Sequence, residues 1–428
     1  MRVVITQIAA TSHLCLTAPI GWALKAAGHD VVVATQPDLL NAVNNTGLTG
    51  VAVGKEARLA ERMANLQPEE TIHGTEYDIT ETRPHVLTYE YTRDTLAALA
   101  SPLSLDLMVD DTMYDDLVAF CRHWRPDLVV WDSVTFSGPV AATVCGAAHV
   151  RTTCGLDHWA RMRELFLRLR RDRPGAEDED PVRDWVAAKL AKYGCDYDES
   201  VILGHATLDS VPSWLRYPTE SAHLPMRYVA HNNPGAFPSW LSESIPDRPR
   251  VCLTMGVSLE EVWRAGATFA LKDLYEAIVD LNVEVIVLSE PPFGDSVTAI
   301  PDNIKFAGFV PNNFLLKSCA AIIHHGGWGT TATAILNGVP QIIIPHSVYD
   351  AHQLAEGVAT RGAGVHLPPD QVSAASLRRE LQRVLEEQTF ARSAAEIRQD
   401  MLSMPTPHDI VKDLDDLVSR HRQATPMR

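Results

Sequence analysis

Three observations predict an α/β protein built on two doubly wound parallel sheets. Short apolar runs rich in β-branched residues alternate along the chain with helical patterns, as in successive βαβ units. Most of these runs are apolar on both faces, as expected of strands covered by helices on each side. The length of 428 residues allows two or three domains, each able to close its own hydrophobic core.

The elements follow this rhythm from the first residue. Met1 to Ile8 is predicted to be a buried strand, and Leu14 to Ala27 a helix that ends at Gly28, the usual position of a C-terminal glycine cap. Later strands are predicted at 31–34, 128–131, 251–255, 283–288, 320–324 and 341–344. A last helical pattern covers 408–422, and it could pack against either domain.

The domain boundary is predicted where periodicity is lost. Residues 224–250 hold five prolines and an Asn pair, which favours a linker. We therefore expect an N-terminal domain at 1–223, a linker at 224–249, a C-terminal domain at 250–405 and a C-terminal helix at 406–428.

Charge and cysteine content exclude several classes of protein. The net charge of −17 would repel nucleic acid or an acidic membrane surface. The seven cysteines are widely separated and never form CxxC, so neither a disulfide framework nor a zinc knuckle is predicted, and a cytoplasmic location fits.

Polar residues interrupt the opening apolar run, which we interpret as structure rather than a signal peptide, and no run is long enough to span a membrane.

Two charged segments stand out. Residues 61–120 carry 13 acidic and 3 basic residues and interrupt the strand rhythm. They are typical of a solvated helical excursion, and the alternative is a partner surface or a lid over the active site. A basic amphipathic helix near Arg161 to Arg173 precedes an acidic loop that ends at Asp184.

The segment Ala320 to Gly338, AAIIHHGGWGTTATAILNG, predicts an anion site. A strand leads into a glycine-rich turn, and the helix after it would present free N–H groups and a positive dipole end to a phosphate or diphosphate. The pattern is neither a P-loop nor GxGxxG. A turn that serves only close packing is the alternative. His324 and His325 would point to opposite faces of a strand, which argues against a metal pair.

His13 and Asp132 are candidates for acid–base chemistry. His13 is predicted in the loop after the first strand, at the edge where doubly wound folds bind ligands. An imidazole with a pKa of about 6.5 can take a proton from a hydroxyl near neutral pH, although a loop histidine can also be structural. Asp132 ends a strand at the same edge and could orient His13; its alternative role is to cap the next helix.

Several segments together resemble one family. HHGGWGTT, the following GVPQIIIPHSVYDAHQLAE, the opening MRVVITQIAATSHLCLTAPIGWALKAAGHDVVVATQP, CRHWRPDLVVWDSVTFSGPVAA and GFVP are similar to inverting GT-B glycosyltransferases of glycosyltransferase family 1, which includes macrolide, anthracycline and other polyketide antibiotic transferases. The resemblance implies two Rossmann-like domains facing across a cleft, with the acceptor bound by 1–223 and the nucleotide sugar by 250–405. It implies no metal and no cofactor.

The resemblance also assigns donor-binding residues by position. They are Ser258 and His325 near the phosphates, Val310 at the nucleobase, Gly327, Gly329 and Thr330 at the diphosphate, and Asp350 at the sugar hydroxyls. The chain departs from the family's Asp-Gln pair, because Ala351 follows Asp350. Loss of this amide suits a donor that lacks a hydroxyl, since an unpaired polar group would be unfavourable. A dTDP-deoxysugar is therefore the expected donor.

The resemblance completes the functional hypothesis: inverting transfer of a deoxysugar to a polyketide aglycone in antibiotic biosynthesis, with His13 as general base assisted by Asp132. Alternatives are a C-glycosyltransferase with Asp132 as base, a nucleotide-sugar 2-epimerase and a non-catalytic sugar-nucleotide-binding helper. Some relatives need an auxiliary protein related to cytochrome P450, for which 61–120 and 161–173 would be contacts, and a homodimer is compatible with the sequence. Aglycone, sugar and O- or C-linkage are not decided by the sequence.

Overall fold

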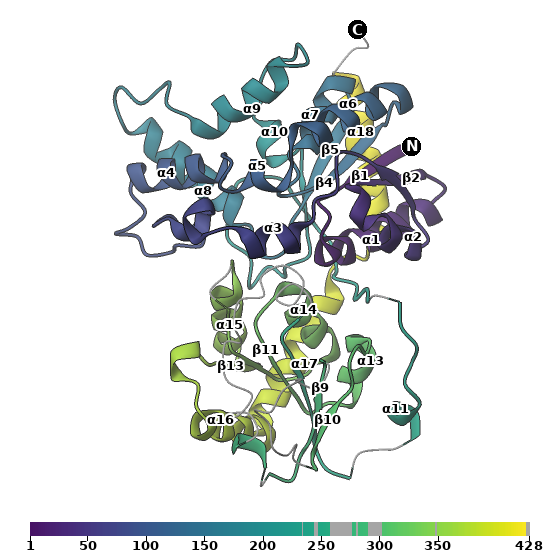
Figure 1. Cartoon of the computed structure of the whole chain (residues 1–428), viewed down its shortest axis with the longest axis vertical. Coiled ribbons are helices and arrows are strands. Elements are labelled where there is room, and N and C mark those ends of the chain that lie inside the picture. The colour runs from purple at the N-terminus through teal and green to yellow at the C-terminus, as the bar shows by residue number, and fades with distance from the viewer. Residues whose placement is uncertain are drawn as a thin grey trace. The chain divides into compact units, whose positions relative to one another are not determined.

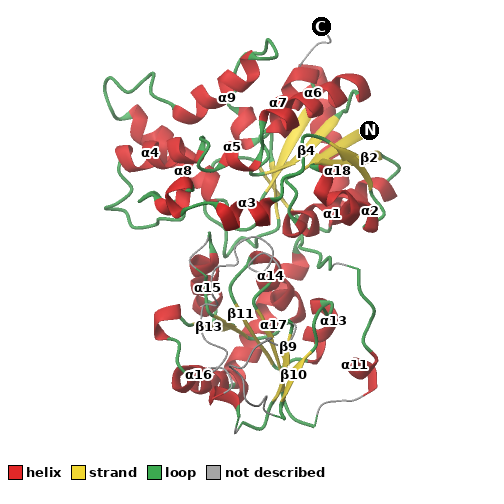
Figure 2. Ribbon diagram, in the orientation of Figure 1, coloured by secondary structure: helices red, strands yellow, loops and turns green. Residues whose placement is uncertain are grey.

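The computed structural model describes residues 1–232, 234–243, 247–256, 276–279, 281–289, 302–346 and 349–424. The chain forms two compact units: the first unit comprises 1–227 together with 405–428, and the second unit comprises 228–404. Each unit contains one parallel sheet with helices on both of its faces (Figures 1 and 2). The predicted fold class, two doubly wound α/β domains, is confirmed.

The sheet of the first unit has seven strands in the order β3-β2-β1-β4-β5-β6-β7. The strands are β1 (Arg2–Thr6), β2 (Asp30–Thr35), β3 (Thr49–Ala52), β4 (Leu128–Asp132), β5 (Ala148–Thr152), β6 (Thr207–Asp209) and β7 (His223–Pro225). Every pair is parallel. The predicted strands at 1–8, 31–34 and 128–131 correspond to β1, β2 and β4.

Helices cover this sheet, and the acidic segment 61–120 is partly helical. The helices are α1 (Thr11–Ala26), α2 (Leu40–Asn45), α3 (Leu59–Asn65), α4 (Tyr89–Leu99), α5 (Leu105–Met108), α6 (Asp111–Trp124), α7 (Ser137–Cys145), α8 (His158–Arg171), α9 (Pro181–Ala191), α10 (Ser200–Leu203) and α18 (Pro407–Ala424). No strand lies between β3 and β4. The segment 61–120 includes the end of α3, all of α4 and α5 and most of α6, while 66–88 contains no α-helix.

The last helix, α18, packs in the first unit, although it is separated from it in sequence by the whole second unit. Ile410, Leu414 and Val418 share a core with Val3 of β1 and Leu24 of α1. Figure 1 accordingly draws the yellow C-terminal helix beside the purple N-terminal elements. The sequence had left open which domain this helix joins, and the structure assigns it to the first.

The sheet of the second unit has six strands in the order β10-β9-β8-β11-β12-β13, all parallel. They are β8 (Arg250–Thr254), β9 (Glu284–Val287), β10 (Ile304–Phe306), β11 (Ala321–His324), β12 (Gln341–Ile343) and β13 (Gly364–His366). The helices with described bounds are α11 (Ser239–Glu243), α13 (Asn312–Leu315), α14 (Trp328–Asn337), α15 (Ala351–Thr360), α16 (Ala374–Glu386) and α17 (Gln388–Ser403). The predicted strands at 251–255, 283–288, 320–324 and 341–344 are confirmed.

Two further observations concern the chain as a whole. All seven cysteines lie in the described ranges, and each is present as a thiol. No helix in those ranges combines the length and the apolar character that a membrane-spanning segment needs.

Candidate active site

Three side chains from distant parts of the sequence meet at the carboxyl edge of the first sheet. Strand β4 lies between β1 and β5, so the segments that follow these strands are neighbours. The Nδ1 atom of His13 lies 3.2 Å from Oδ2 of Asp132 and 3.3 Å from Sγ of Cys154. The sequence predicted the approach of His13 to Asp132; Cys154 was missed.

The predicted loop at His13 was wrong. Helix α1 begins at Thr11, with the extended Ala10 as its N-cap, and the backbone N–H groups of His13 and Leu14 both donate to the carbonyl of Ala10. His13 therefore lies in the first helical turn. A helix fixes the direction of a side chain more firmly than a loop does, which holds the imidazole toward Asp132.

Asp132 is fully buried and held by its own neighbours. Its Oδ2 accepts hydrogen bonds from the backbone N–H of Ile8 at 3.2 Å and from the hydroxyl of Thr135 at 2.7 Å. Its Oδ1 accepts from the backbone N–H of Val134 at 2.9 Å. Helix α7 has Phe136 as N-cap and no side-chain cap, so the alternative role of Asp132 as a cap for this helix is not observed.

The charges of this cluster support one another. Burial works against a charged imidazole, but attraction to Cys154 and to Asp132 outweighs it and raises the pKa of His13 well above 6.5. Burial would likewise raise the pKa of Asp132, but attraction to His13 and several donated hydrogen bonds hold it below 3.8. The pair can therefore stabilise the imidazolium that forms when His13 takes a proton.

The predicted anion site lies at the carboxyl edge of the second sheet. After β11, Gly326 has a φ of +91°, and the extended Gly327 is the N-cap of α14. Among the described residues, no side chain caps this helix and no acidic residue lies in its first turn. Its N-terminal amides and dipole are thus available to an anion.

His325 is enclosed by glycines. A Cβ on Gly256, which follows β8, would lie 2.3 Å from Cε1 of His325, and a Cβ on Gly327 would lie 2.6 Å from its Nε2. Burial, with smaller effects of His324 and His346, lowers the pKa of His325 to about 3, so the ring is neutral. Among the described residues, its buried Nδ1 has no hydrogen-bond partner, and a bound ligand could supply that contact.

His324 has a different role from its neighbour. It is fully buried; its Nε2 lies 2.9 Å from Oε1 of Gln341, and its Nδ1 accepts from the backbone N–H of Gly326 at 3.1 Å. The rings of His324 and His325 are 6.4 Å apart and nearly perpendicular. His324 therefore supports the turn from the core.

The other predicted donor residues are placed as follows. Val310 is buried after β10, and the side chain of its neighbour in sequence, Phe309, is 51% exposed. Asp350 is the N-cap of α15. A Cβ on Gly326 would lie 3.0 Å from Cβ of Ala351, so the start of α15 adjoins the glycine-rich turn. Ser258 lies outside the described residues.

Gly329 and Thr330 occupy the first turn of α14. The carbonyl of Gly329 accepts from the hydroxyl of Tyr228 at 3.2 Å and from that of Thr333 at 2.6 Å. Their amides, together with Gly327, form the helix start that the resemblance assigns to the diphosphate.

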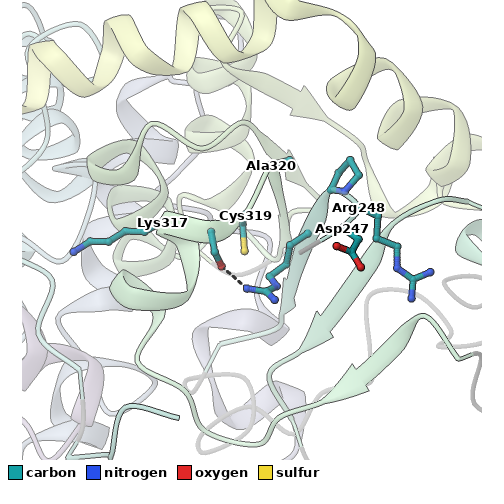
Figure 3. Close-up of a pocket in the computed structure, with 8 residues that line it drawn as sticks. Asp247, Arg248, Lys317, Cys319 and Ala320 are labelled. Carbon is teal, nitrogen blue, oxygen red and sulfur yellow. Dashed lines mark hydrogen bonds between the residues drawn. The ribbon is translucent and has the colours of Figure 1, made fainter. Parts of the chain in front are cut away.

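A separate hollow lies at the opposite edge of the second sheet. Figure 3 shows Lys317 and Arg248 around it, near the amino ends of β8 and β11. It has a volume of about 450 Å³, and Arg250 within it donates to the hydroxyl of Ser318 at 2.8 Å. Because parallel α/β sheets bind ligands at their carboxyl edges, this hollow is not the donor site.

Two parallel α/β units, one with a His–Asp pair and the other with a glycine-rich helix start, define a glycosyltransferase of the GT-B fold. This class is supported by solved structures. The glycosyltransferase VinC in complex with dTDP is 38% identical, with 98% of this chain and 100% of that chain covered and a TM-score of 0.87. The spinosyn forosaminyltransferase SpnP is 37% identical over 98% and 99% of the two chains, with a TM-score of 0.79.

More particularly, the chain belongs to the erythromycin biosynthesis protein CIII-like family, whose N-terminal and C-terminal domain models match residues 22–256 and 272–417. The aclacinomycin-T 2-deoxy-L-fucose transferase of Streptomyces galilaeus is 41% identical, with 99% of this chain and 97% of the relative covered. The 10-deoxymethynolide desosaminyltransferase of Streptomyces venezuelae is 39% identical over 99% and 98%. These relatives are named transferases, which favours the enzyme over the epimerase and the helper.

Proposed function

We propose that this glycosyltransferase moves a deoxysugar from a dTDP-linked donor to a hydroxyl of a polyketide aglycone, with inversion at the anomeric carbon. The names of the relatives support a deoxysugar and an antibiotic aglycone, and the dTDP bound to VinC supports the nucleotide. The observation that carries the chemistry is the contact between His13 and Asp132 at the carboxyl edge of the first sheet.

The acceptor is activated by His13. In the neutral form of His13, Asp132 accepts a hydrogen bond from Nδ1–H, which leaves Nε2 as the proton acceptor. Because the pKa of His13 is raised, this neutral form becomes more abundant as the pH rises. Nε2 takes the hydroxyl proton while the acceptor oxygen attacks the anomeric carbon from the side opposite the diphosphate, and Asp132 stabilises the resulting imidazolium. Holding acceptor and donor in line supplies the proximity contribution to the rate.

The leaving diphosphate is stabilised by the second unit without a metal or cofactor. The first-turn amides of α14 and the neutral His325 offer hydrogen-bond donors to the charge that develops as the anomeric bond breaks. Two observations within the described ranges support this role: no side chain caps the start of α14, and Nδ1 of His325 has no hydrogen-bond partner.

Asp132 is the weaker candidate for the base, even for a C-glycoside. Its two oxygens already accept hydrogen bonds from Ile8, Val134 and Thr135, and it is fully buried. His13, whose side chain is 18% exposed, is the member of the pair that solvent or substrate can reach. We therefore propose O-transfer with His13 as base.

The sugar specificity is proposed to depend on Ala351. This residue is 4% exposed and takes the position of the family's glutamine, next to the glycine-rich turn. Because alanine has no amide, the methyl group of Ala351 leaves no unpaired polar group against the part of the sugar that lacks a hydroxyl.

The proposal includes an auxiliary protein related to cytochrome P450 that would contact the first unit. Its expected contact, the basic helix α8, is engaged inside the first unit. Arg161 donates to the carbonyls of Ile79 and Glu81, and Arg163 pairs with Asp180 at 2.6 Å. Just beyond the helix, Arg173 pairs with Glu90. This helix presents less unpaired charge than its sequence suggests. The acidic segment 61–120 is the remaining candidate contact.

The proposal is tested with the full chain, dTDP-deoxysugars and a panel of polyketide aglycones, with and without such a helper. Aglycone-dependent release of dTDP and an O-linked product of inverted anomeric configuration are expected. His13→Ala should lose transfer by a factor of about 10² to 10⁴ and keep its affinity for dTDP. Unreduced transfer by this variant, a C-linked product, or a product with the anomeric configuration of the donor would each contradict the proposal. Equal rates with and without the helper would contradict the need for an auxiliary protein.

A further inference from the structure

Three different metal-binding side chains converge at the carboxyl edge of the first sheet. One ligand atom from each of His13, Asp132 and Cys154 lies within 4.8 Å of the other two. In the described part of the chain, this is the one group of at least three histidine, cysteine or acidic residues with such close ligand atoms. The proposed transfer assigns steps to His13 and Asp132 and none to the thiol of Cys154.

The spacing of these atoms suits zinc. Zinc binds nitrogen, oxygen and sulfur at about 2.0 to 2.3 Å in tetrahedral sites, which places neighbouring ligand atoms about 3.3 to 3.7 Å apart. Nδ1 of His13 lies 3.2 Å from Oδ2 of Asp132 and 3.3 Å from Sγ of Cys154, so small shifts of side chains would admit the ion. Magnesium prefers oxygen ligands alone and would not select this set.

Neighbouring groups fix the carboxylate of Asp132, and the partial exposure of His13 gives an ion access to the three ligand atoms. Thr135 and the backbone N–H of Ile8 fix the carboxylate of Asp132, as groups behind a metal ligand commonly do. Asp132 is fully buried, while the His13 side chain is 18% exposed and Cys154 is partly buried. An ion can therefore enter from the side of His13, with water as its fourth ligand.

We propose that His13, Cys154 and Asp132 form a binding site for Zn²⁺ and that its occupation blocks sugar transfer. The ion would take Nδ1 of His13 and Oδ2 of Asp132 as ligands and so replace the hydrogen bond between them. Because a metal-bound Nδ1 carries no proton, the imidazole binds as its Nε2–H tautomer and Cys154 binds as its thiolate, and any further proton of the two groups is released to solvent. Zinc binding is independent of the proposed function; the block of transfer rests on it.

Cobalt(II) tests the site directly, because a Co²⁺–thiolate bond absorbs in the near ultraviolet. Titration of the full chain with CoCl₂, without substrates, should give this band with one ion per chain, and Zn²⁺ should displace it while Mg²⁺ should not. Cys154→Ser should lose the band and bind Zn²⁺ at least tenfold more weakly. Cys195→Ser removes another partly buried thiol of the same unit. This control variant should keep both the absorption band and the affinity for Zn²⁺.

His13→Gln is the second variant, with circular dichroism and dTDP binding as checks of folding for each protein. It should weaken Zn²⁺ binding as Cys154→Ser does. A missing band in the unaltered chain, or a band that survives in Cys154→Ser, would overturn the site. In transfer assays Zn²⁺ should inhibit the unaltered chain reversibly, with activity restored by a chelator, and inhibition that persists in Cys154→Ser would overturn the block. A chain that binds Zn²⁺ but transfers no sugar would contradict the proposed function and leave the metal site standing.

Discussion

The imidazole of His325 lies directly against Gly327, since a β-carbon on that glycine would stand 2.6 Å from Nε2. The turn can therefore hold the ring in place only while it carries no side chain. Gly327 has an ordinary φ of −63°. Glycine is therefore required at this position because the imidazole approaches so closely, and not because of backbone strain.

Gly327→Ala should consequently displace His325 and weaken dTDP binding. We expect at least a tenfold rise in Kd, which corresponds to about 1.4 kcal/mol, measured by calorimetry. Gly329→Ala adds the same methyl group two residues later, where it meets only the hydroxyl of Tyr228 at 3.6 Å, and should weaken binding much less. Equal effects of the two substitutions would show that His325 does not contact the donor.

Asp132→Asn should reduce kcat far more than it changes donor affinity. The amide keeps the shape of the carboxylate but removes the charge that stabilises the His13 imidazolium, and we expect a loss of about 10² or more. Steady-state rates and dTDP binding measure the two effects. Thr135→Val removes one hydrogen bond of 2.7 Å to Asp132 and should cause a smaller loss; an unchanged kcat in Asp132→Asn would exclude the dyad.

Ala351→Gln should alter the preference between sugars. The longer side chain brings an amide to a buried position beside Gly326, where it is left unpaired with a deoxysugar and can pair with an added hydroxyl. The ratio of kcat/KM for the deoxysugar donor to that for its hydroxylated counterpart should fall about tenfold or more. Ala351→Gly is the control without an amide, and a similar change of the ratio in that variant would assign the effect to packing alone.

Stability should fall in mild acid because of buried neutral histidines. Burial lowers the pKa of His324 to about 4, whereas an imidazole of the unfolded chain titrates at about 6.5. Between these values only the unfolded chain binds the proton, so stability is complete above 6.5 and falls as the pH drops toward 4, by about 2 kcal/mol at pH 5. Denaturant unfolding at about pH 7.5 and pH 5 measures the loss, which His324→Gln should reduce; an equal loss in that variant would point to other groups.

Leu414→Ala should destabilise the first unit. This side chain of α18 is fully buried in the core shared with β1, and such truncations cost about 2 to 5 kcal/mol. Thermal unfolding should show the loss, while the second unit should keep its affinity for dTDP. Leu402 precedes α18 within the second unit, and Leu402→Ala serves as a comparison; a similar loss of first-unit stability there would argue against the packing described for α18.

The central strands could be predicted because they are continuous apolar runs, as in VVVA of β2 and LVVW of β4. β5 was missed because its sequence AHVRT includes His149 and Arg151, whose burial depends on partners elsewhere. Arg151 pairs with Asp157 and donates to the hydroxyl of Thr207 at 3.0 Å. A single sequence gives no sign of such pairing before the fold is known.

The candidate site was predictable to a similar degree. The glycine-rich turn and the aspartate at the end of β4 are local patterns, and both lie where strand ends were predicted. Cys154 is 141 positions away from His13, and only the strand order β1-β4-β5 brings the two together. The helical position of His13 was missed because the N-cap, Ala10, lacks a capping side chain. Thr11 and Ser12 are of the type that commonly caps helices but lie inside the first turn, so they suggest a later start.

The hydrogen bond of 2.6 Å from the backbone N–H of Arg227 to the carbonyl of Pro405 closes residues 228–404 into an insertion whose two ends meet. An exchange of the second unit between related enzymes should therefore transplant this insertion with both junctions, at 227/228 and 404/405. A chimera cut only once, in the linker, would replace α18 with a foreign helix and leave the recipient's first unit with a mismatched core.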